Sequence, residues 1–149
     1  MEHDHQHEKS VEILIVEDNV ADVELMRELF SESKLANNVS VVNDGDAAMD
    51  FLYRQGRFAA APRPDLILLD LGLPRKTGFE VLAEIKADPA LRAIPVIILT
   101  SSSEESDILK CYNLHANSFI SKPFHLLDFY NVLKVIEEFW FEIVKLPRR

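Results

Sequence analysis

The chain has 149 residues, of which 48% are apolar and 28% are charged. This length fits one domain with a full hydrophobic core and leaves no room for a second. Acidic residues outnumber basic ones by 25 to 16, and the formal net charge of -9 argues against nucleic acid as a partner. The apolar runs are far shorter than the roughly 18 residues of a membrane span, so we expect no membrane association.

The polar N-terminus, residues 1–10, is rich in histidine, and we interpret it as a disordered tail before one domain at 11–149. It lacks the apolar stretch and basic start of a secretory signal. The single cysteine, Cys111, cannot form an internal disulfide. Both features favour the cytoplasm. His3, His5 and His7 alternate and could bind a transition metal, but an unstructured terminus is the simpler interpretation.

Five short apolar runs, each bounded by polar or turn-forming residues, predict β-strands, and a segment with helical spacing follows each of them. The runs at 13–16, 66–69 and 96–99 do not alternate with polar residues, which is typical of parallel strands buried on both faces. We therefore expect a doubly wound α/β fold. In chain order the predicted elements are strand 12–16, helix 21–33, strand 39–42, helix 46–53, strand 66–69, helix 78–87, strand 96–100, helix 104–114, strand 118–121 and helix 126–145. The loop at 54–64 is long for this fold, and we interpret it as a surface insertion.

Polar side chains follow four of the predicted strands: Glu17 and Asp18 after the first, Asp70 after the third, Thr100 at the end of the fourth, and Lys122 after the fifth. Because the carboxyl ends of parallel strands meet at one edge of the sheet, we expect these side chains to lie together. Clustered carboxylates repel one another and remain charged only around a cation. A set of ligands made only of oxygen suits Mg²⁺, which binds a few carboxylates together with phosphate oxygens.

The same residues predict phosphoryl transfer. Asp70, on the central strand, is the expected nucleophile, because carboxylates form acyl phosphates in covalent catalysis. The Lys122 ammonium and the Thr100 hydroxyl are groups that can hold phosphoryl oxygens. A lone Asp or Lys-Pro at a strand end is more often a cap or a turn residue. Four strand ends with complementary groups make a shared site the better interpretation.

In this combination the motifs resemble the receiver domain of two-component response regulators, from about residue 11 to 145. The resemblance implies a flavodoxin-like parallel sheet of five strands in the order 2-1-3-4-5, with five helices. It implies that Asp70 accepts a phosphoryl group from a histidine kinase. It also implies that Mg²⁺ is bound by the side chains of Asp18 and Asp70, by the backbone carbonyl of Gly72, and by Glu17 through a water molecule.

The resemblance further implies a two-state switch. Thr100, Ser101 and Lys122 would contact the phosphoryl group, and Phe119 would be the switch aromatic that fills the space behind Thr100. The Lys122-Pro123 peptide bond is expected to be cis. Output would be a change in a protein-binding or dimerisation surface, because no effector domain follows in this chain.

Two positions depart from what is frequent in the family. Gly72 stands where many receiver domains carry a larger side chain, and that side chain can influence how fast the aspartyl phosphate hydrolyses. Phe119 stands where Tyr is frequent, and Phe cannot donate a hydrogen bond at the surface.

The last predicted helix is unusually apolar. At about 100° per residue its charges gather on one side, and the remaining apolar arc is wider than packing on its own domain needs. Such an excess predicts an interface, and we expect a homodimer through this helix. The alternative is that the extra apolar residues cover the insertion at 54–64. The residues expected to face the sheet are Phe129, Val132, Leu133, Ile136, Trp140 and Ile143; those expected at the dimer interface are Tyr130, Val135, Phe139 and Phe141.

A narrower resemblance rests on the insertion, on the phrase LDLGLPRKTGFEVLAEIK and on the terminal IEEFWFEIVKLP. Together they are similar to the single-domain regulators of bacterial phytochrome histidine kinases, of the cyanobacterial type. This implies a phytochrome-type sensor kinase as partner, with a kinase of another sensory type as the alternative.

Two other functions fit a strand-end Asp in this topology. A Mg²⁺-dependent phosphatase or phosphotransferase would usually need a general acid near Asp70, but Leu71 and Gly72 follow it with no second Asp. A flavin-binding module shares the topology, but three carboxylates at the strand ends would repel a flavin phosphate. We therefore expect a phosphoacceptor signalling protein and no classical enzyme, with self-catalysed phosphorylation from small phosphodonors and autodephosphorylation as its own chemistry.

Overall fold

The computed structural model describes residues 10–147, so all but one residue of the predicted N-terminal tail lies outside it. Five parallel strands form one sheet in the order β2-β1-β3-β4-β5, which confirms the predicted fold class and strand order. The strands are β1 (Val11–Val16), β2 (Asn37–Val42), β3 (Leu66–Leu69), β4 (Val96–Thr100) and β5 (Ser118–Ser121).

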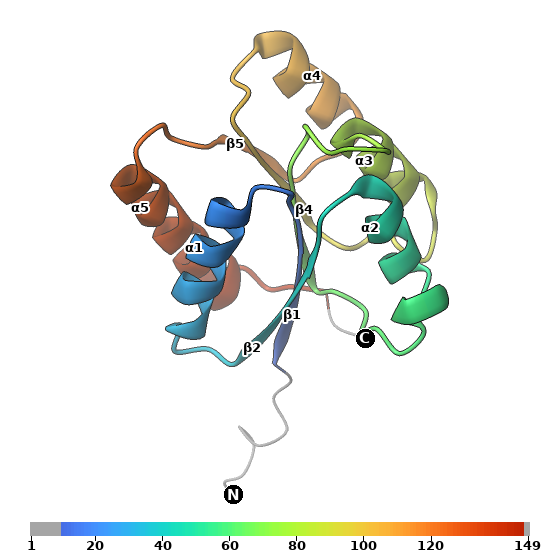
Figure 1. Cartoon of the computed structure of the whole chain (residues 1–149), viewed down its shortest axis with the longest axis horizontal. Coiled ribbons are helices and arrows are strands. Elements are labelled where there is room, and N and C mark those ends of the chain that lie inside the picture. The colour runs from blue at the N-terminus through green and yellow to red at the C-terminus, as the bar shows by residue number, and fades with distance from the viewer. Residues whose placement is uncertain (1–9, 148–149) are drawn as a thin grey trace, which may run out of the picture.

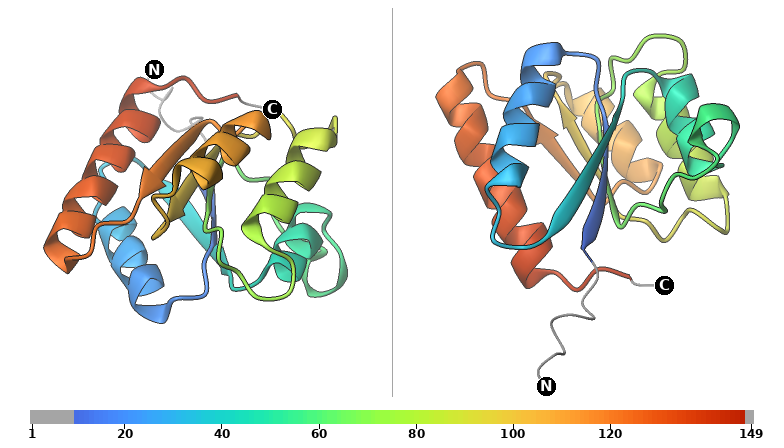
Figure 2. Two further views of the ribbon diagram at one scale, coloured as in Figure 1. Left: turned by 90° about the horizontal axis from the view of Figure 1, so that it is seen from above. Right: turned by 60° about the horizontal axis from the view of Figure 1, so that its bottom comes forward.

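Helices cover both faces of this sheet. α1 and α5 pack side by side on one face, and α2, α3 and α4 lie on the other (Figures 1 and 2). Within residues 10–147 no helix is long and apolar enough to span a bilayer. The helices are α1 (Val20–Ser31), α2 (Gly45–Leu52), α3 (Gly78–Ala87), α4 (Glu105–Asn113) and α5 (Leu126–Glu137), with a π-helix, η3 (Glu138–Ile143), continuing α5.

The central strands carry the core. Successive side chains of a strand point to opposite faces of the sheet. Thus Leu14 and Val16 of β1 pack under α2 and α3, while Ile13 and Ile15 pack under α1 and α5. Every residue of β3 and β4 is buried, which explains why their sequences do not alternate with polar residues.

Polar caps fix where three helices begin beside the carboxyl edge of the sheet. The Asn19 side chain accepts a hydrogen bond from the first turn of α1, and the Asp44 side chain does the same for α2. Thr77 and Glu80 form a capping box at the start of α3. These caps set the direction in which the chain leaves strands β1, β2 and β3.

The insertion at 54–64 is packed against the domain. It contains a short 3-10 helix, η2 (Gly56–Phe58), and the Phe58 ring lies 5.4 Å from the Phe51 ring of α2. Phe58 and Ala61 join the core under α2 and α3. The last helix lies on the opposite face of the sheet (Figure 2), so the alternative that it covers this insertion is wrong.

The last helix differs from its prediction at one residue. Phe141 was expected at the surface, but it is only 7% exposed and its ring stacks on that of Phe30 at 5.4 Å. The reason is the π-helix, whose i→i+5 turns are wider than those of an α-helix and rotate the later side chains toward the core. Phe141 is therefore removed from the candidate interface.

The other interface candidates keep some exposure. Val135 is 63% and Phe139 is 47% exposed. Tyr130 is half-buried, and its hydroxyl donates to Glu32, the residue just after α1, at 3.3 Å. Residues expected to face the sheet do so where they are described, including Phe129, Leu133 and Ile136; the Ile143 side chain lies outside the description.

Candidate functional site

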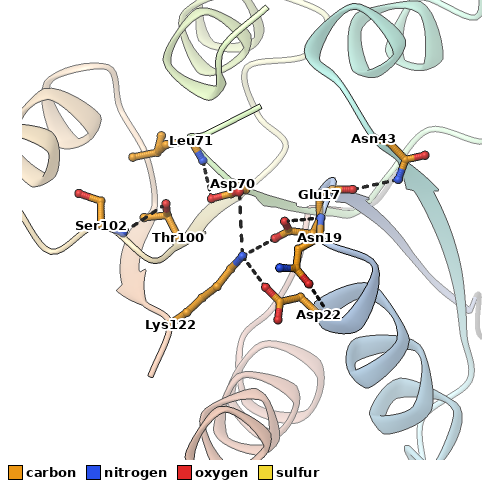
Figure 3. A network of polar contacts seen from close by, with 9 residues as sticks. All are labelled: Glu17, Asn19, Asp22, Asn43, Asp70, Leu71, Thr100, Ser102 and Lys122. Atoms are coloured by element: carbon orange, nitrogen blue, oxygen red, sulfur yellow. Dashed lines mark hydrogen bonds and ion pairs between the residues drawn. The ribbon is translucent and has the colours of Figure 1, made fainter. Parts of the chain in front are cut away.

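The carboxyl edge of the sheet brings together side chains from four strand ends. Glu17 and Asp18 follow β1, Asp70 follows β3, Thr100 ends β4 and Lys122 follows β5. Figure 3 shows Glu17, Asp70 and Lys122 pointing toward one another. The convergence predicted from the sequence is therefore present in the fold.

Three carboxylates form the acidic part of this site. One oxygen from each of Glu17, Asp18 and Asp70 lies within 4.8 Å of the others. Glu17 is 2% exposed and Asp70 is 9% exposed, whereas Asp18 reaches solvent. Oxygen ligands of this kind fit a hard divalent cation, which would also relieve the repulsion among the three charges.

Lys122 brings a positive charge to the three carboxylates of this site. Its Nζ donates to Glu17 Oε1 at 2.6 Å and to Asp22 Oδ2 at 2.9 Å, and lies 4.0 Å from Asp70 Oδ2 (Figure 3). Burial lowers the pKa of Lys122, but the hydrogen bonds to Glu17 and Asp22 outweigh it and the net pKa is raised. The group is a charged ammonium beside the carboxylates.

Sequence reasoning missed Asp22. The strand-end pattern marks only residues directly after a strand, and Asp22 reaches the site from the first turn of α1. The sequence does hold one signal for it: Asp22 comes three residues after the helix cap Asn19. A carboxylate at that position in the first turn of a helix lies close to the end of the preceding strand.

Glu17 is held tightly in a buried position. Its Oε2 accepts a hydrogen bond from the Asn19 N–H at 3.1 Å, and its backbone carbonyl accepts one from Asn43 Nδ2 at 3.0 Å. Burial raises the pKa of Glu17 and the charge of Asp70 adds to this, although the hydrogen bond from Lys122 opposes both. The charged form of Glu17 therefore depends on nearby positive charge.

Asp70 is fixed by the junction between β3 and α3. Its Oδ1 accepts a hydrogen bond from the Leu71 N–H at 2.9 Å, and the Gly78 N–H donates to the Leu71 carbonyl at 3.0 Å. A β-carbon at Gly78 would lie 2.2 Å from the Asp70 carbonyl oxygen, so only glycine allows α3 to begin this close to Asp70.

The predicted switch residues differ in their burial and in their distance along the sheet from the strand ends. Thr100 is buried, and its hydroxyl accepts a hydrogen bond from the Ser102 N–H at 3.5 Å, whereas Ser101 is exposed. Phe119 lies on β5 opposite Ile98, half-buried against the core under α4. Its N–H donates to the Tyr112 hydroxyl at 3.1 Å. Phe119 is therefore part of the packing behind the site.

The predicted cis bond at Lys122-Pro123 is wrong. Among residues 10–147 every peptide bond is trans. The trans form of an X-Pro bond is favoured by about 0.5–1 kcal/mol unless packing imposes the cis form. Here the next residue, Phe124, is fully exposed, so tight packing does not constrain the chain beyond Pro123.

Comparisons with known proteins agree with this fold. The sequence profile of the response regulator receiver domain matches residues 13–134. The chain is 47% identical over 135 residues to the response regulator Rcp1 of Synechocystis sp., a match that spans 91% of this chain and 92% of that protein.

Two solved structures are similar over nearly the whole chain. The Mn²⁺-bound form of Rcp1 matches with a TM-score of 0.91 at 46% identity, covering 93% of this chain and 99% of that one. The phosphorylated cyanobacterial phytochrome response regulator RcpA matches with a TM-score of 0.91 at 47% identity, covering 94% and 100%. Fold and site thus define a receiver domain. The chain belongs to the response regulator receiver family, a family of signalling proteins, and is a homologue of Rcp1.

Proposed function

We propose that this protein is a response regulator that accepts a phosphoryl group on Asp70 from a histidine kinase of the phytochrome type. The observation that carries the proposal is the convergence of Glu17, Asp18, Asp70 and Lys122 at one edge of the sheet. The family assignment favours this function over the phosphatase and flavin-binding alternatives.

The site fits a divalent cation, and we propose Mg²⁺. Asp18 and Asp70 would bind the ion with their side chains, Gly72 with its carbonyl and Glu17 through water. The oxygen-only ligand set supports this choice, and the similar protein Rcp1 has been crystallised with Mn²⁺. When bound, the cation supplies positive charge that neutralises phosphoryl oxygens.

The transfer step uses groups of this chain. An Asp70 carboxylate oxygen attacks phosphorus, the P–N bond of a phosphohistidine breaks, and the imidazole leaves with its bonding electron pair. Lys122, whose Nζ already lies 4.0 Å from Asp70, and Thr100 would hold phosphoryl oxygens, with Ser101 as a further contact. With acetyl phosphate a P–O bond breaks instead and acetate leaves, so no kinase is needed.

Exposed apolar side chains flank the site and suit a protein phosphodonor. Val20, at the start of α1, is 71% exposed. Phe124, between β5 and α5, is fully exposed, and Leu127, in the first turn of α5, is 72% exposed. A kinase that presents a phosphohistidine to Asp70 must approach this edge, and burial of these residues would stabilise the encounter. The likeness to RcpA supports a phytochrome-type donor.

For output, we propose a homodimer through the last helix. Val135 and Phe139 give this surface its exposed apolar area, and Tyr130 on the same helix remains a further candidate. Coupling to Asp70 would run through Thr100 and Phe119, which lie on the adjacent strands β4 and β5.

The phosphoacceptor assignment is tested by intact mass spectrometry. The protein is incubated with acetyl phosphate and Mg²⁺, and separately with a phosphorylated phytochrome kinase. We expect one added phosphoryl group in the wild type and in the control variant Asp50→Asn, which changes an exposed carboxylate on α2. Asp70→Asn should remain unlabelled. Equal labelling of Asp70→Asn would contradict the assignment, and a faster transfer from an unrelated sensor kinase would contradict the phytochrome pairing.

The dimer is tested by sedimentation velocity with and without acetyl phosphate. The double variant Val135→Glu with Phe139→Glu should sediment as a monomer at concentrations where the wild type is a dimer. Val20→Glu, which changes an even more exposed apolar residue beside the phosphorylation site, serves as the control and should keep the dimer. A wild type that stays monomeric in both conditions would disprove the dimer.

A further inference from the structure

Lys122 has a strong partner that does not belong to the acidic cluster. Asp22 Oδ2 lies 2.9 Å from Lys122 Nζ, and the Asp22 side chain is only 20% exposed. The carboxylates grouped within 4.8 Å are Glu17, Asp18 and Asp70, so within the described part of the chain Asp22 stands outside the group that could hold a cation. Its contact with Lys122 calls for a separate role.

Asp22 is placed by the backbone of α1. It lies in the first turn of that helix, and its N–H donates to the Oδ1 of the capping residue Asn19 at 3.0 Å. A carboxylate in the first turn is also favoured by the positive end of the helix dipole. The carboxylate of Asp22 is therefore attached to a rigid element next to the end of β1.

The geometry around Lys122 leaves one donor for a further acceptor. An ammonium has three N–H donors. Two of them serve Glu17 at 2.6 Å and Asp22 at 2.9 Å, and Asp70 Oδ2, at 4.0 Å, lies beyond hydrogen-bond distance. In Figure 3 the Lys122 nitrogen lies between these three carboxylates.

We propose that Asp22 is a positioning residue for phosphoryl transfer, which together with Glu17 fixes the Lys122 ammonium so that its third donor serves a phosphoryl oxygen on Asp70. The inference rests on the proposed function of Asp70. A lysine side chain is long and flexible, and one ion pair would leave it free to rotate. A second anchor holds the ammonium in place before the phosphoryl group arrives, which lowers the reorganisation needed during the reaction.

The first test measures the initial rate of labelling by acetyl phosphate and Mg²⁺, followed by intact mass. Asp22→Asn keeps the size of the side chain but removes its charge, and we expect labelling about tenfold slower. Glu24→Gln removes the same charge from an exposed position on the same helix and should label at the wild-type rate. An unchanged or faster rate in Asp22→Asn would overturn the inference.

A double-mutant cycle separates positioning from a general effect on α1. If Asp22 acts through Lys122, Asp22→Asn should have no further effect in a Lys122→Met background. If the same slowing appears in both backgrounds, Asp22 does not act through Lys122 and the inference fails.

The ¹⁵N signal of the Lys122 ammonium gives a readout that needs no phosphoryl transfer. It should be lost through faster hydrogen exchange in Asp22→Asn and persist in Glu24→Gln; its persistence in both would also overturn the inference.

The failures of the two proposals are distinguishable. If the wild type takes up no phosphoryl group, or if Asp70→Asn takes one up equally, the proposed function fails. If the wild type is labelled on Asp70 and Asp22→Asn matches its rate, only the role of Asp22 fails.

Discussion

The carboxyl edge of the sheet and the last helix each carry groups in an unfavourable environment: charges that are buried at the edge, and apolar side chains that are exposed on the helix. At the edge, the charge of buried Lys122 is compensated inside the chain by Glu17 and Asp22. On the last helix, Val135 and Phe139 expose apolar surface to solvent. The edge thus needs no partner to compensate its buried charge, whereas the exposed face of the last helix would be covered only by another protein.

Two phenylalanines show the same contrast between a buried and an exposed environment within one segment. Phe139 and Phe141 are two residues apart in the π-helix, yet Phe139 is 47% exposed and Phe141 is 7% exposed. Phe141 stacks on Phe30 of α1 and joins the core. The outer face of this segment is therefore separable by mutation from the face that holds the domain together.

The largest effect should come from breaking the compensation at the edge. Lys122→Met removes the partner of Glu17, which is 2% exposed, and leaves a buried carboxylate beside Asp70. We expect the free energy of unfolding at neutral pH without metal to fall by about 3 kcal/mol, together with slower but still measurable phosphorylation by acetyl phosphate. Urea unfolding measures the change, and added Mg²⁺ should restore part of it.

The control for that variant is Lys110→Met, which removes the same charge from an exposed residue of α4. Lys110 lies over the Phe79 ring, 4.2 Å from its centroid, so its loss should cost less than about 1 kcal/mol. Equal destabilisation by the two lysine variants would show that the ion pairs of Lys122 are not special.

The next effect sharpens the contrast between the two phenylalanines. Phe141→Ala should lower the free energy of unfolding by about 3 kcal/mol, because it leaves a cavity against Phe30. Phe139→Ala should change monomer stability by less than about 1 kcal/mol and weaken self-association instead. Urea unfolding at low protein concentration and sedimentation at high concentration give the two readouts. Similar unfolding energies for both variants would place both rings in one environment and contradict the π-helix register.

The smallest expected effect is a pH dependence at the edge. The pKa of Glu17 is raised by burial and by Asp70. The Glu17 carboxyl group therefore stays protonated to a higher pH in the folded protein than in the unfolded chain. Between the ordinary value of 4.5 and the raised pKa, the folded state binds more protons, so stability without metal falls as pH rises. Subtracting the urea unfolding curves of Glu17→Gln from those of the wild type should isolate this slope. A difference that rises with pH would contradict it.

The site was predictable from the sequence because topology alone brings it together. Apolar runs mark the ends of β1, β3, β4 and β5, and parallel strands must bring those ends to one edge. Asp22 was not predictable by that rule, because it approaches from within a helix and its role depends on the direction set by the Asn19 cap. The cis bond expected at Lys122-Pro123 came from the family resemblance alone, and the trans form in the structure contradicts it.

The last helix shows where periodicity fails. A constant rotation of about 100° per residue predicts the exposure of Val135 and Phe139 but turns Phe141 outward. The change to i→i+5 hydrogen bonding after Glu137 carries no clear sequence signal, and it coincides with the packing of Phe141 against α1 and the core. Local patterns therefore predict a helix well until tertiary contacts change its geometry.

Gly72 and Gly78 stand close to Asp70 in the sequence, but only one of them is fixed by the fold. A β-carbon at Gly78 would collide with the Asp70 backbone, whereas nothing lies within 4 Å of the place that a β-carbon at Gly72 would take. A β-carbon can therefore be added at position 72 without repacking. By the family resemblance, a side chain at position 72 is expected to influence the hydrolysis of an aspartyl phosphate. We therefore expect the lifetime of the phosphorylated state, and with it the memory of each stimulus, to be tunable at this position without altering the architecture that records it.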